Sequence, residues 1–207
     1  MNSDLSSYII HLSKDKKFAR ILENQQLLKV SKHRHVHLYL CYSILGQQLS
    51  TKVAATIRKR FLKLYEGKPT PDQILATSHE TLRSIGLSGA KANYVHNVAR
   101  FTIEFGLNHQ LLKKMSNEEV IEYLTKIKGV GRWTAEMLLM FTLGREDVFA
   151  VDDLGIQQAM IKIYKLDKTN KKKLREDMLK ISGNWSPYRT YACLHLWHHK
   201  DNLPDSA

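Results

Sequence analysis

The chain has 207 residues, of which 43% are hydrophobic and 25% are charged, an ordinary composition for a globular protein. No apolar run approaches the roughly 18–20 residues that a membrane-spanning helix requires, which argues against a transmembrane protein. The amino terminus lacks the basic start and the long apolar stretch of a signal peptide, so we expect a soluble intracellular protein.

The charge balance is strongly basic, with 32 Lys and Arg residues against 20 Asp and Glu residues and a net charge of +12. Such an excess favours a polyanionic partner, either nucleic acid or an anionic membrane surface, and does not choose between them. The densest basic segment, residues 162–175, is interpreted as a solvated helix face or turn, with direct phosphate contact as the alternative.

The cysteine content limits the metal sites that the chain can form. There are two cysteines, Cys41 and Cys193, and they do not form a close pair. This excludes a zinc ribbon and a four-cysteine iron–sulfur site. Because both residues lie among apolar, helical patterns, we interpret them as reduced residues of the core.

Helical signals follow one another along the chain, and strand signals are nearly absent. Apolar residues at four-residue spacing, from Leu45 to Phe61, predict an apolar stripe on a helix. Later helices are predicted to begin at the capping residues Thr70, Ser78 and Ser116, and another helix is predicted after a chain break at Ser88-Gly89. After Ser88, the apolar residues expected on one side of a helix are Val95, Val98, Ala99 and Ile103. The sequence therefore predicts an all-α fold without a long linker or a clear repeat.

The most specific local pattern lies between Leu124 and Ala135. A helix ends there, Gly129-Val130-Gly131 forms a tight turn, and a second helix begins at once. Glycines permit backbone angles that are closed to other residues, and they let the turn approach another surface closely. The amides at the start of the second helix favour an anion such as a phosphate. An ordinary helix–turn–helix connection with a glycine cap is the alternative interpretation.

Two adjacent acids, Asp152 and Asp153, end an apolar segment twenty residues after Trp133. Helix capping is the simple interpretation, because a helix is predicted to begin near Leu154. In a DNA-binding protein, however, a carboxylate repels phosphate, and such a residue is more plausible where chemistry requires it. The residues alone leave both interpretations open.

The hairpin, the spacing and the downstream acid together resemble the helix–hairpin–helix DNA glycosylase superfamily. The resemblance is closest to the compact form of its DNA-3-methyladenine glycosylase II (AlkA-like) branch. It covers roughly residues 36–200 and includes the stretches Ile44–Ser50, Leu82–Leu87 and Tyr188–Ala192. It implies a single glycosylase domain over residues 1–207, built as two helical lobes that flank a DNA-binding cleft.

The resemblance also implies the type of chemistry. The catalytic aspartate of the family falls on Asp153, and Asp152 then becomes a local cap or a helper. Bifunctional members carry a lysine that attacks the sugar where this chain has Trp133, so lyase activity is not expected. Water is then the nucleophile, and ionised Asp153 stabilises the positive sugar. No cofactor is expected to be required, and two cysteines cannot hold the iron–sulfur cluster of many bifunctional members.

A pocket for an electron-poor base is a further expectation. A base methylated at N3 or N7 is cationic, and an indole face attracts such a cation by roughly 0.5–2 kcal/mol. By the resemblance, Trp133 and Trp197 line this pocket, although each is also interpretable as a core aromatic. Met137 is also expected to line this pocket, at a position where relatives carry an aromatic residue, which implies a looser pocket.

DNA contacts are expected on three segments. Gln48 or Leu49 is expected to fill the space left by the flipped nucleotide, whose extrusion costs a few kcal/mol, and an exposed helix end is the alternative. The backbone contacts expected from the resemblance are Ser88, Gly89, Lys91, Gly129, Val130, Gly131, Arg132 and Thr134. The positions whose main-chain carbonyls match a monovalent-cation site of the family, for Na+ or K+, are Thr125, Ile127 and Val130.

The expected function is the hydrolytic excision of alkylated bases, such as 3-methyladenine and 7-methylguanine, from double-stranded DNA by base flipping. The product is an abasic site for base excision repair. A monomer without membrane contact is expected, in the cytoplasm or nucleoid of a prokaryote or the nucleus of a eukaryote. Two alternatives remain: a glycosylase for an oxidised or mismatched base, and a non-catalytic protein that binds damaged DNA.

Overall fold

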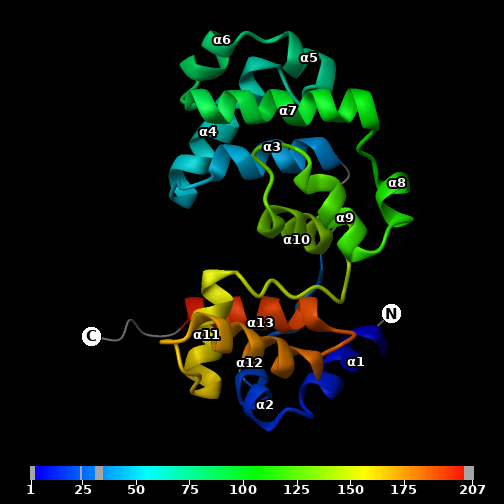
Figure 1. Ribbon diagram of the computed structural model, residues 1–207, viewed down its shortest axis with the longest axis vertical. Helices are drawn as coiled ribbons and strands as arrows, with labels where there is room; N and C mark the ends of the chain where they lie inside the picture. Colours follow the sequence, from blue (N-terminus) through cyan, green and yellow to red (C-terminus); the bar gives the residue numbers. More distant parts are fainter. Residues whose placement is uncertain (1–2, 24, 31–34, 203–207) are drawn as a thin grey trace. The chain divides into compact units, whose positions relative to one another are not determined.

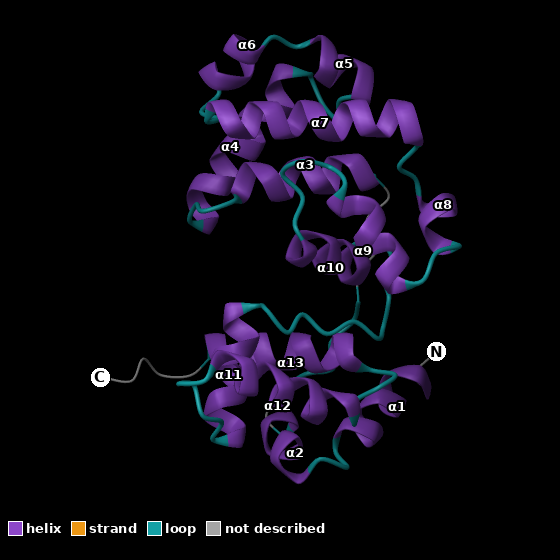
Figure 2. Ribbon diagram, viewed as in Figure 1, coloured by secondary structure: helices purple, strands orange, loops and turns teal. Residues whose placement is uncertain are grey.

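The computed structural model describes residues 3–23, 25–30 and 35–202 (Figure 1). These residues form helices, turns and loops without a β-strand, as Figure 2 shows, so the predicted all-α class is confirmed. Residues 32–143 form one compact unit, and residues 1–31 together with 144–207 form a second unit. No helix in the described part of the chain is long and apolar enough to cross a membrane.

The unit of residues 32–143 is arranged around α3 (Val36–Gly46), which packs against α4, α7 and α10. This helix is apolar on most of its circumference, which is the pattern of a helix buried on several sides. The other helices of the unit are α4 (Thr51–Leu64), α5 (Pro71–Ala76), α6 (His79–Ser84), α7 (Gly89–Phe105), α8 (His109–Lys113), α9 (Asn117–Thr125) and α10 (Arg132–Phe141). The long helix α7 also packs against α5 and α6 (Figure 1).

The predicted capping residues begin the helices of this unit. Thr70 and Ser116 each form a capping box, and Ser78 accepts a backbone amide of the first turn of α6. Ser88, where only a chain break was predicted, caps α7 in the same way. Each cap satisfies an amide that would otherwise have no partner inside the helix. The apolar residues predicted for one side of α7 share that side, and the last of them, Ile103, is 48% exposed near the end of the helix. The apolar residues of α7 that do enter the core are Val95, Val98 and Ala99.

The helical stripe predicted from Leu45 to Phe61 is wrong, because two helices share this segment. Helix α3 ends at Gly46, and α4 begins at Thr51 after the N-cap Ser50, whose hydroxyl accepts the amide of Val53. The four-residue spacing therefore continues across a turn. The Ser50 side chain bonds to the backbone there and begins a new helix. The consequence is that Leu49 and Val53 are 38% and 45% exposed instead of buried.

The second unit consists of α1 (Ser3–Leu12), α2 (Lys16–Leu22), α11 (Leu154–Tyr164), α12 (Lys171–Gly183) and α13 (Arg189–Asp201). In its core, side chains from the amino-terminal helices pack against side chains from the carboxy-terminal part of the chain. Tyr8 stacks on Tyr191 with ring centroids 4.2 Å apart, and Phe18 packs against the buried Trp185. The lysines that begin α12 are exposed, in agreement with a solvated helix face. Cys193 and, in the other unit, Cys41 are fully buried, which confirms that both are core residues.

Candidate DNA-binding and catalytic site

The predicted hairpin joins α9 to α10 through a turn whose two glycines have different roles. Gly129 has a φ of +107°, and a Cβ there would lie 2.3 Å from Cγ of Tyr94, so no larger residue fits. Gly131 is the N-cap of α10 and supplies no side-chain acceptor to its first turn. A Cβ on Gly131 would meet no atom within 4 Å. Gly129 is therefore required for packing, whereas Gly131 leaves the amide end of a helix uncovered.

Side chains from two neighbouring segments hold the hairpin turn. Gln47 donates from Nε2 to the carbonyl of Gly129 at 3.1 Å, and Asn97 donates from Nδ2 to the carbonyl of Lys128 at 3.1 Å. These bonds tie the turn to the α3–α4 connection and to α7. Sequence reasoning missed both residues, because an amide that binds a distant carbonyl leaves no local pattern.

Three of the hairpin residues predicted to contact DNA have side chains that are buried or ion-paired. Val130 and Thr134 are only 5% and 4% exposed, which leaves their main chain as the part that a phosphate can reach. Arg132 binds Glu118 through two guanidinium nitrogens and Glu136 through Nε at 3.1 Å. The hydrogen bond from Arg132 lowers the pKa of the Glu118 carboxyl. The Arg132 guanidinium is thus paired with two carboxylates of the chain, and the DNA contact expected at this residue stays a prediction.

The turn between α3 and α4 carries the two candidates for the flipping wedge. Gln48 has a φ of +57°, in the left-handed region that few residues other than glycine adopt. Such a conformation is held by its surroundings and is more common at functional sites than elsewhere. Gln48 and Leu49 are both exposed, so either side chain is available to enter a duplex.

Ser88, Gly89 and Lys91, which were predicted to contact DNA, lie at the start of α7. Ser88 caps the helix by accepting the amide of Lys91 at 3.3 Å, and Gly89 is exposed beside it. The Lys91 ammonium donates to the carbonyls of Leu45 at 3.0 Å and Gln47 at 2.6 Å, and burial lowers its pKa. Lys91 therefore fastens the end of α3 to α7, and the contact with DNA expected at Lys91 stays a prediction.

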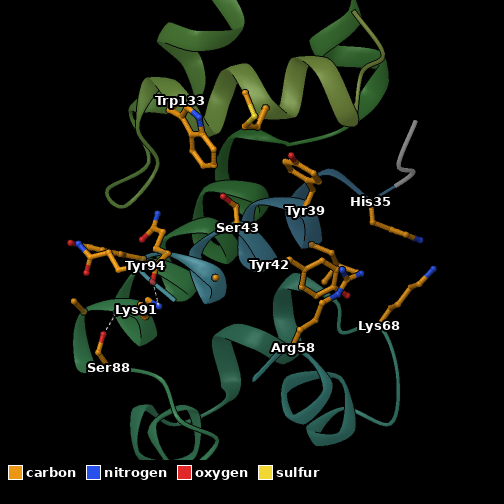
Figure 3. A pocket seen from close by; sticks show the side chains of 16 residues that line it. His35, Tyr39, Tyr42, Ser43, Arg58, Lys68, Ser88, Lys91, Tyr94 and Trp133 are labelled. Carbon is orange, nitrogen blue, oxygen red and sulfur yellow. Dashed lines mark hydrogen bonds between the residues drawn. The ribbon is translucent and has the colours of Figure 1, made fainter. Parts of the chain in front are cut away.

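A cavity of about 1030 Å³ opens within this unit, and Trp133 and Met137 line it from α10 (Figure 3). The indole of Trp133 is 44% exposed, whereas Met137 is 5% exposed. The residues of α3 that line the cavity share one helical face and are Leu38, Tyr39, Tyr42, Ser43 and Gly46. The sequence predicted the two α10 residues and missed the α3 face, because an aromatic face on a buried helix reads as core.

In the other unit, Asp153 is the N-cap of α11. Its Oδ1 accepts the amide of Ile156 at 2.9 Å and the indole N–H of Trp197 at 2.9 Å. The capping and catalytic interpretations therefore fall on the same residue. Asp152 is not the cap: its side chain is half exposed and pairs with Arg175 at 3.4 Å.

The surroundings of Asp153 include two further residues. Trp197 does not belong to the lining of the Trp133 cavity, and its polar edge is committed to Asp153. Gly155 was not predicted, yet a Cβ at this position would lie 3.2 Å from both Asp153 Oδ1 and Trp197 Cδ1. A side chain at residue 155 would press on the hydrogen-bonded pair, so Gly155 gives the two side chains their space.

Comparisons with known proteins agree with these features. Residues 41–183 match the family model of the HhH-GPD superfamily base excision DNA repair proteins. The chain is 34% identical over 203 residues to DNA-3-methyladenine glycosylase 1 of Schizosaccharomyces pombe, covering 94% of this chain and 87% of the relative.

Solved structures give the same result. A 3-methyladenine DNA glycosylase of S. pombe in complex with abasic DNA has a TM-score of 0.83 at 33% identity, covering 97% of this chain and 99% of that one. A DNA-3-methyladenine glycosidase of Bacillus halodurans also has a TM-score of 0.83, at 34% identity, covering 97% and 91% of the two chains. This chain belongs to the HhH-GPD superfamily of base excision DNA repair proteins, within its DNA-3-methyladenine glycosylase II branch.

Proposed function

We propose that the protein is a monofunctional DNA glycosylase that hydrolyses the N-glycosidic bond of alkylated bases, such as 3-methyladenine and 7-methylguanine, in duplex DNA. The observation that carries the proposal is the Asp153 carboxylate, fixed by Trp197 and by the first turn of α11. The names of the relatives support the same substrate class. The place of action is the DNA itself, in a nucleoid or a nucleus.

Asp153 serves as the electrostatic group of this reaction. The bond between C1′ and the base nitrogen breaks, and its electron pair neutralises the positive charge of the alkylated ring. The sugar becomes oxocarbenium-like, and an ionised carboxylate stabilises this positive charge and orients the attacking water. The oxygen of the water joins C1′, and its proton passes to the carboxylate and then to solvent. The first turn of α11 and the Trp197 N–H both direct hydrogen-bond donors at this carboxylate.

Trp133 serves as the recognition surface for the base. Its indole is 44% exposed on the cavity wall, so a flat ligand can stack on it. A cationic purine gains up to about 2 kcal/mol from an indole face, and a neutral purine gains less. Met137 beside it supplies a polarisable surface that adapts to different ring substituents.

Base flipping and DNA binding involve three exposed turns of the unit of residues 32–143. Gln48 or Leu49 fills the space of the extruded nucleotide, because both are exposed on the turn before α4. The amide end of α10 after Gly131 binds a phosphate of the DNA backbone independently of sequence. Exposed Gly89 at the start of α7 allows a second close approach of the backbone.

The same proposal excludes strand cleavage by a lysine nucleophile. Trp133 occupies the position at which bifunctional relatives carry the lysine, and an indole forms no Schiff base. The ammonium of Lys91, which also lines the cavity, is engaged by two carbonyls. Borohydride treatment of a mixture with abasic DNA should therefore trap no covalent complex. A trapped complex would show that another amine performs lyase chemistry.

No cofactor is required for the proposed reaction, although the hairpin carbonyls fit a monovalent cation. The family resemblance assigns such an ion to the carbonyls of Thr125, Ile127 and Val130, and the neighbouring Lys128 and Gly129 carbonyls already accept side-chain amides. Ile127 accepts one amide at 2.9 Å and retains a second lone pair. Such an ion would hold the turn in the shape that presents the α10 amides. Replacing K+ and Na+ by tetramethylammonium at constant ionic strength should then weaken DNA binding.

The decisive experiment measures free methylated bases released from methylated duplex DNA by the wild-type protein and by Asp153→Asn. Asparagine is an equally good N-cap, so the variant should keep its fold and its DNA affinity while losing at least about 100-fold in rate. Release by neither protein would overturn the assignment to alkylated bases. A panel of oxidised and mismatched bases would then separate the other glycosylase function from a non-catalytic binding protein.

A further inference from the structure

The segment of residues 162–175 is the most basic part of the chain, and the proposed reaction gives it no role. It carries seven Lys and Arg residues and a single acid, Asp167. All seven cations are exposed, whereas Asp167 accepts the backbone amide of Thr169 at 2.8 Å and its hydroxyl at 2.7 Å. An excess of cations on one surface attracts a polyanion, and this chain belongs to a family of DNA repair proteins. DNA is therefore the partner that this charge fits.

The start of α12 holds three of these cations at positions that helix stability does not favour. Lys171, Lys172 and Lys173 begin the helix, and its first turn contains no acid. The amino-terminal end of a helix carries positive partial charge, so acids stabilise it and cations destabilise it. No ion pair of the described residues involves these lysines or the acids that follow, Glu176 and Asp177. The three lysines are thus placed at a cost to the helix, and their charge is available to a ligand.

Arg175 places this end of α12 beside the proposed catalytic residue. Its Nε lies 3.4 Å from Oδ1 of Asp152, and Asp152 directly precedes Asp153. All of these residues belong to the unit that contains α11 and α12 (Figure 1). Lys171 and Lys172 precede Arg175 by four and three residues, so they lie on the same side of the helix, about one turn of 5.4 Å away.

The proposed reaction determines where the DNA strand passes. When the sugar of the flipped nucleotide lies at Asp153, its two phosphates are only a few ångströms away, because they are bonded to its 3′ and 5′ oxygens. Further phosphates follow along the strand at a rise of roughly 3.4 Å per nucleotide. The Asp152 carboxylate repels this strand, and its pairing with Arg175 offsets the repulsion. Cations one helical turn from Arg175 are therefore near the path of the damaged strand.

We infer that Lys171 and Lys172 bind phosphates of the damaged strand next to the flipped nucleotide, while Arg175 offsets the charge of Asp152. The contact is independent of the base sequence, because phosphate contacts position a protein on DNA without reading its bases. The inference rests on the proposed function, since the sugar at Asp153 places the strand. It gives the unit that carries Asp153 a DNA contact of its own, in addition to the hairpin of the other unit.

The first test measures how the full chain binds a duplex with a single tetrahydrofuran abasic analogue over a series of KCl concentrations. Lys171→Gln and Lys172→Gln should each reduce the magnitude of the slope of log affinity against log salt by about one, the value of one phosphate contact. Lys173→Gln is the matched control, because it removes the same charge from the same turn on the side opposite Arg175. This variant should leave the slope nearly unchanged.

The Tm of all three variants should equal or exceed the wild-type value, because each removes a cation from the first turn of a helix. A second test locates the contact with duplexes in which a methylphosphonate replaces one charged phosphate at a time. On the damaged strand beside the analogue, this replacement should weaken wild-type binding and have a clearly smaller effect on the Lys171→Gln/Lys172→Gln double variant. On the opposite strand, it should affect the two proteins equally.

Three results would overturn the inference. One is an unchanged slope in both Lys171→Gln and Lys172→Gln, and another is an equal decrease in Lys173→Gln, which would indicate a general effect of net charge. The third is a methylphosphonate effect beside the analogue that is the same in the wild-type protein and the double variant, because the lysines would then act elsewhere. Release of 7-methylguanine is measured on the same preparations. If the wild-type protein releases none, the proposed function itself fails, whereas release with unchanged slopes contradicts this inference alone.

Discussion

Trp197 donates its indole N–H to Oδ1 of Asp153 at 2.9 Å, and the same oxygen accepts the amide of Ile156 at 2.9 Å. These two donors hold the Asp153 carboxylate in one orientation. Gly155 leaves room for the indole, so that Trp197 can approach Asp153. Trp197 is therefore a positioning residue for the proposed catalytic carboxylate.

Replacing Trp197 by Phe removes this donor and keeps an aromatic ring. A hydrogen bond to a charged group contributes about 1.5–3 kcal/mol, so the single-turnover rate of 7-methylguanine release should fall by at least about tenfold. DNA affinity should remain at the wild-type value. A rate that stays unchanged in Trp197→Phe would show that the ring acts by stacking, since phenylalanine preserves the flat surface.

The two hairpin glycines provide a matched pair of variants. Gly129→Ala places a methyl group against Tyr94 at a φ of +107°, which should lower stability by about 2 kcal/mol or more. For a chain of this size, this corresponds to a fall in Tm of roughly 4–8 °C. Gly131→Ala meets no atom and should leave Tm nearly unchanged, while its methyl group weakens duplex binding. Equal losses of Tm in both variants would contradict this division of roles.

Arg132 gives a test of ion pairing against DNA contact. Arg132→Gln deprives Glu136, whose side chain is 3% exposed, of its charged partner, and stability should fall by about 1–3 kcal/mol. The dependence of DNA affinity on salt should not change, because the wild-type guanidinium is already bound to two carboxylates. If Arg132 binds a phosphate, the slope of log affinity against log salt should instead decrease in magnitude by about one.

His195 should make stability depend on pH. Burial lowers its pKa to about 4, helped by repulsion from His198, and its ring is bonded to Gln25 at 2.6 Å and to Tyr8 at 3.3 Å. The unfolded chain, with a pKa near 6.5, binds the proton first as pH falls. The stabilisation from neutral His195 is therefore complete above pH 6.5 and lost between pH 6.5 and about 4. Denaturant unfolding of the wild-type protein and of His195→Gln across this range should show a shallower slope in the variant.

Local signals in the sequence were sufficient for much of the fold. The caps Thr70, Ser78 and Ser116 act on amides within three residues, so their pattern is complete in the sequence itself. The prediction of one helical stripe from Leu45 to Phe61 was wrong, because residue spacing shows the periodicity of a segment but not whether the helix is interrupted. Only the packing of α3 and the cap at Ser50 end one helix and begin another there.

The same distinction applies to the candidate site. The sequence by itself determined the helical class, the hairpin and the identity of Asp153 and Trp133 as candidates, because motif spacing and residue chemistry are local properties. Tertiary structure decided that Asp153 is held by Trp197, that Arg132 and Lys91 are committed to protein groups, and that Tyr42 and Arg58 share a cavity. These contacts join residues that are far apart in the chain or on different helices, and only the folded backbone brings such groups within hydrogen-bonding distance.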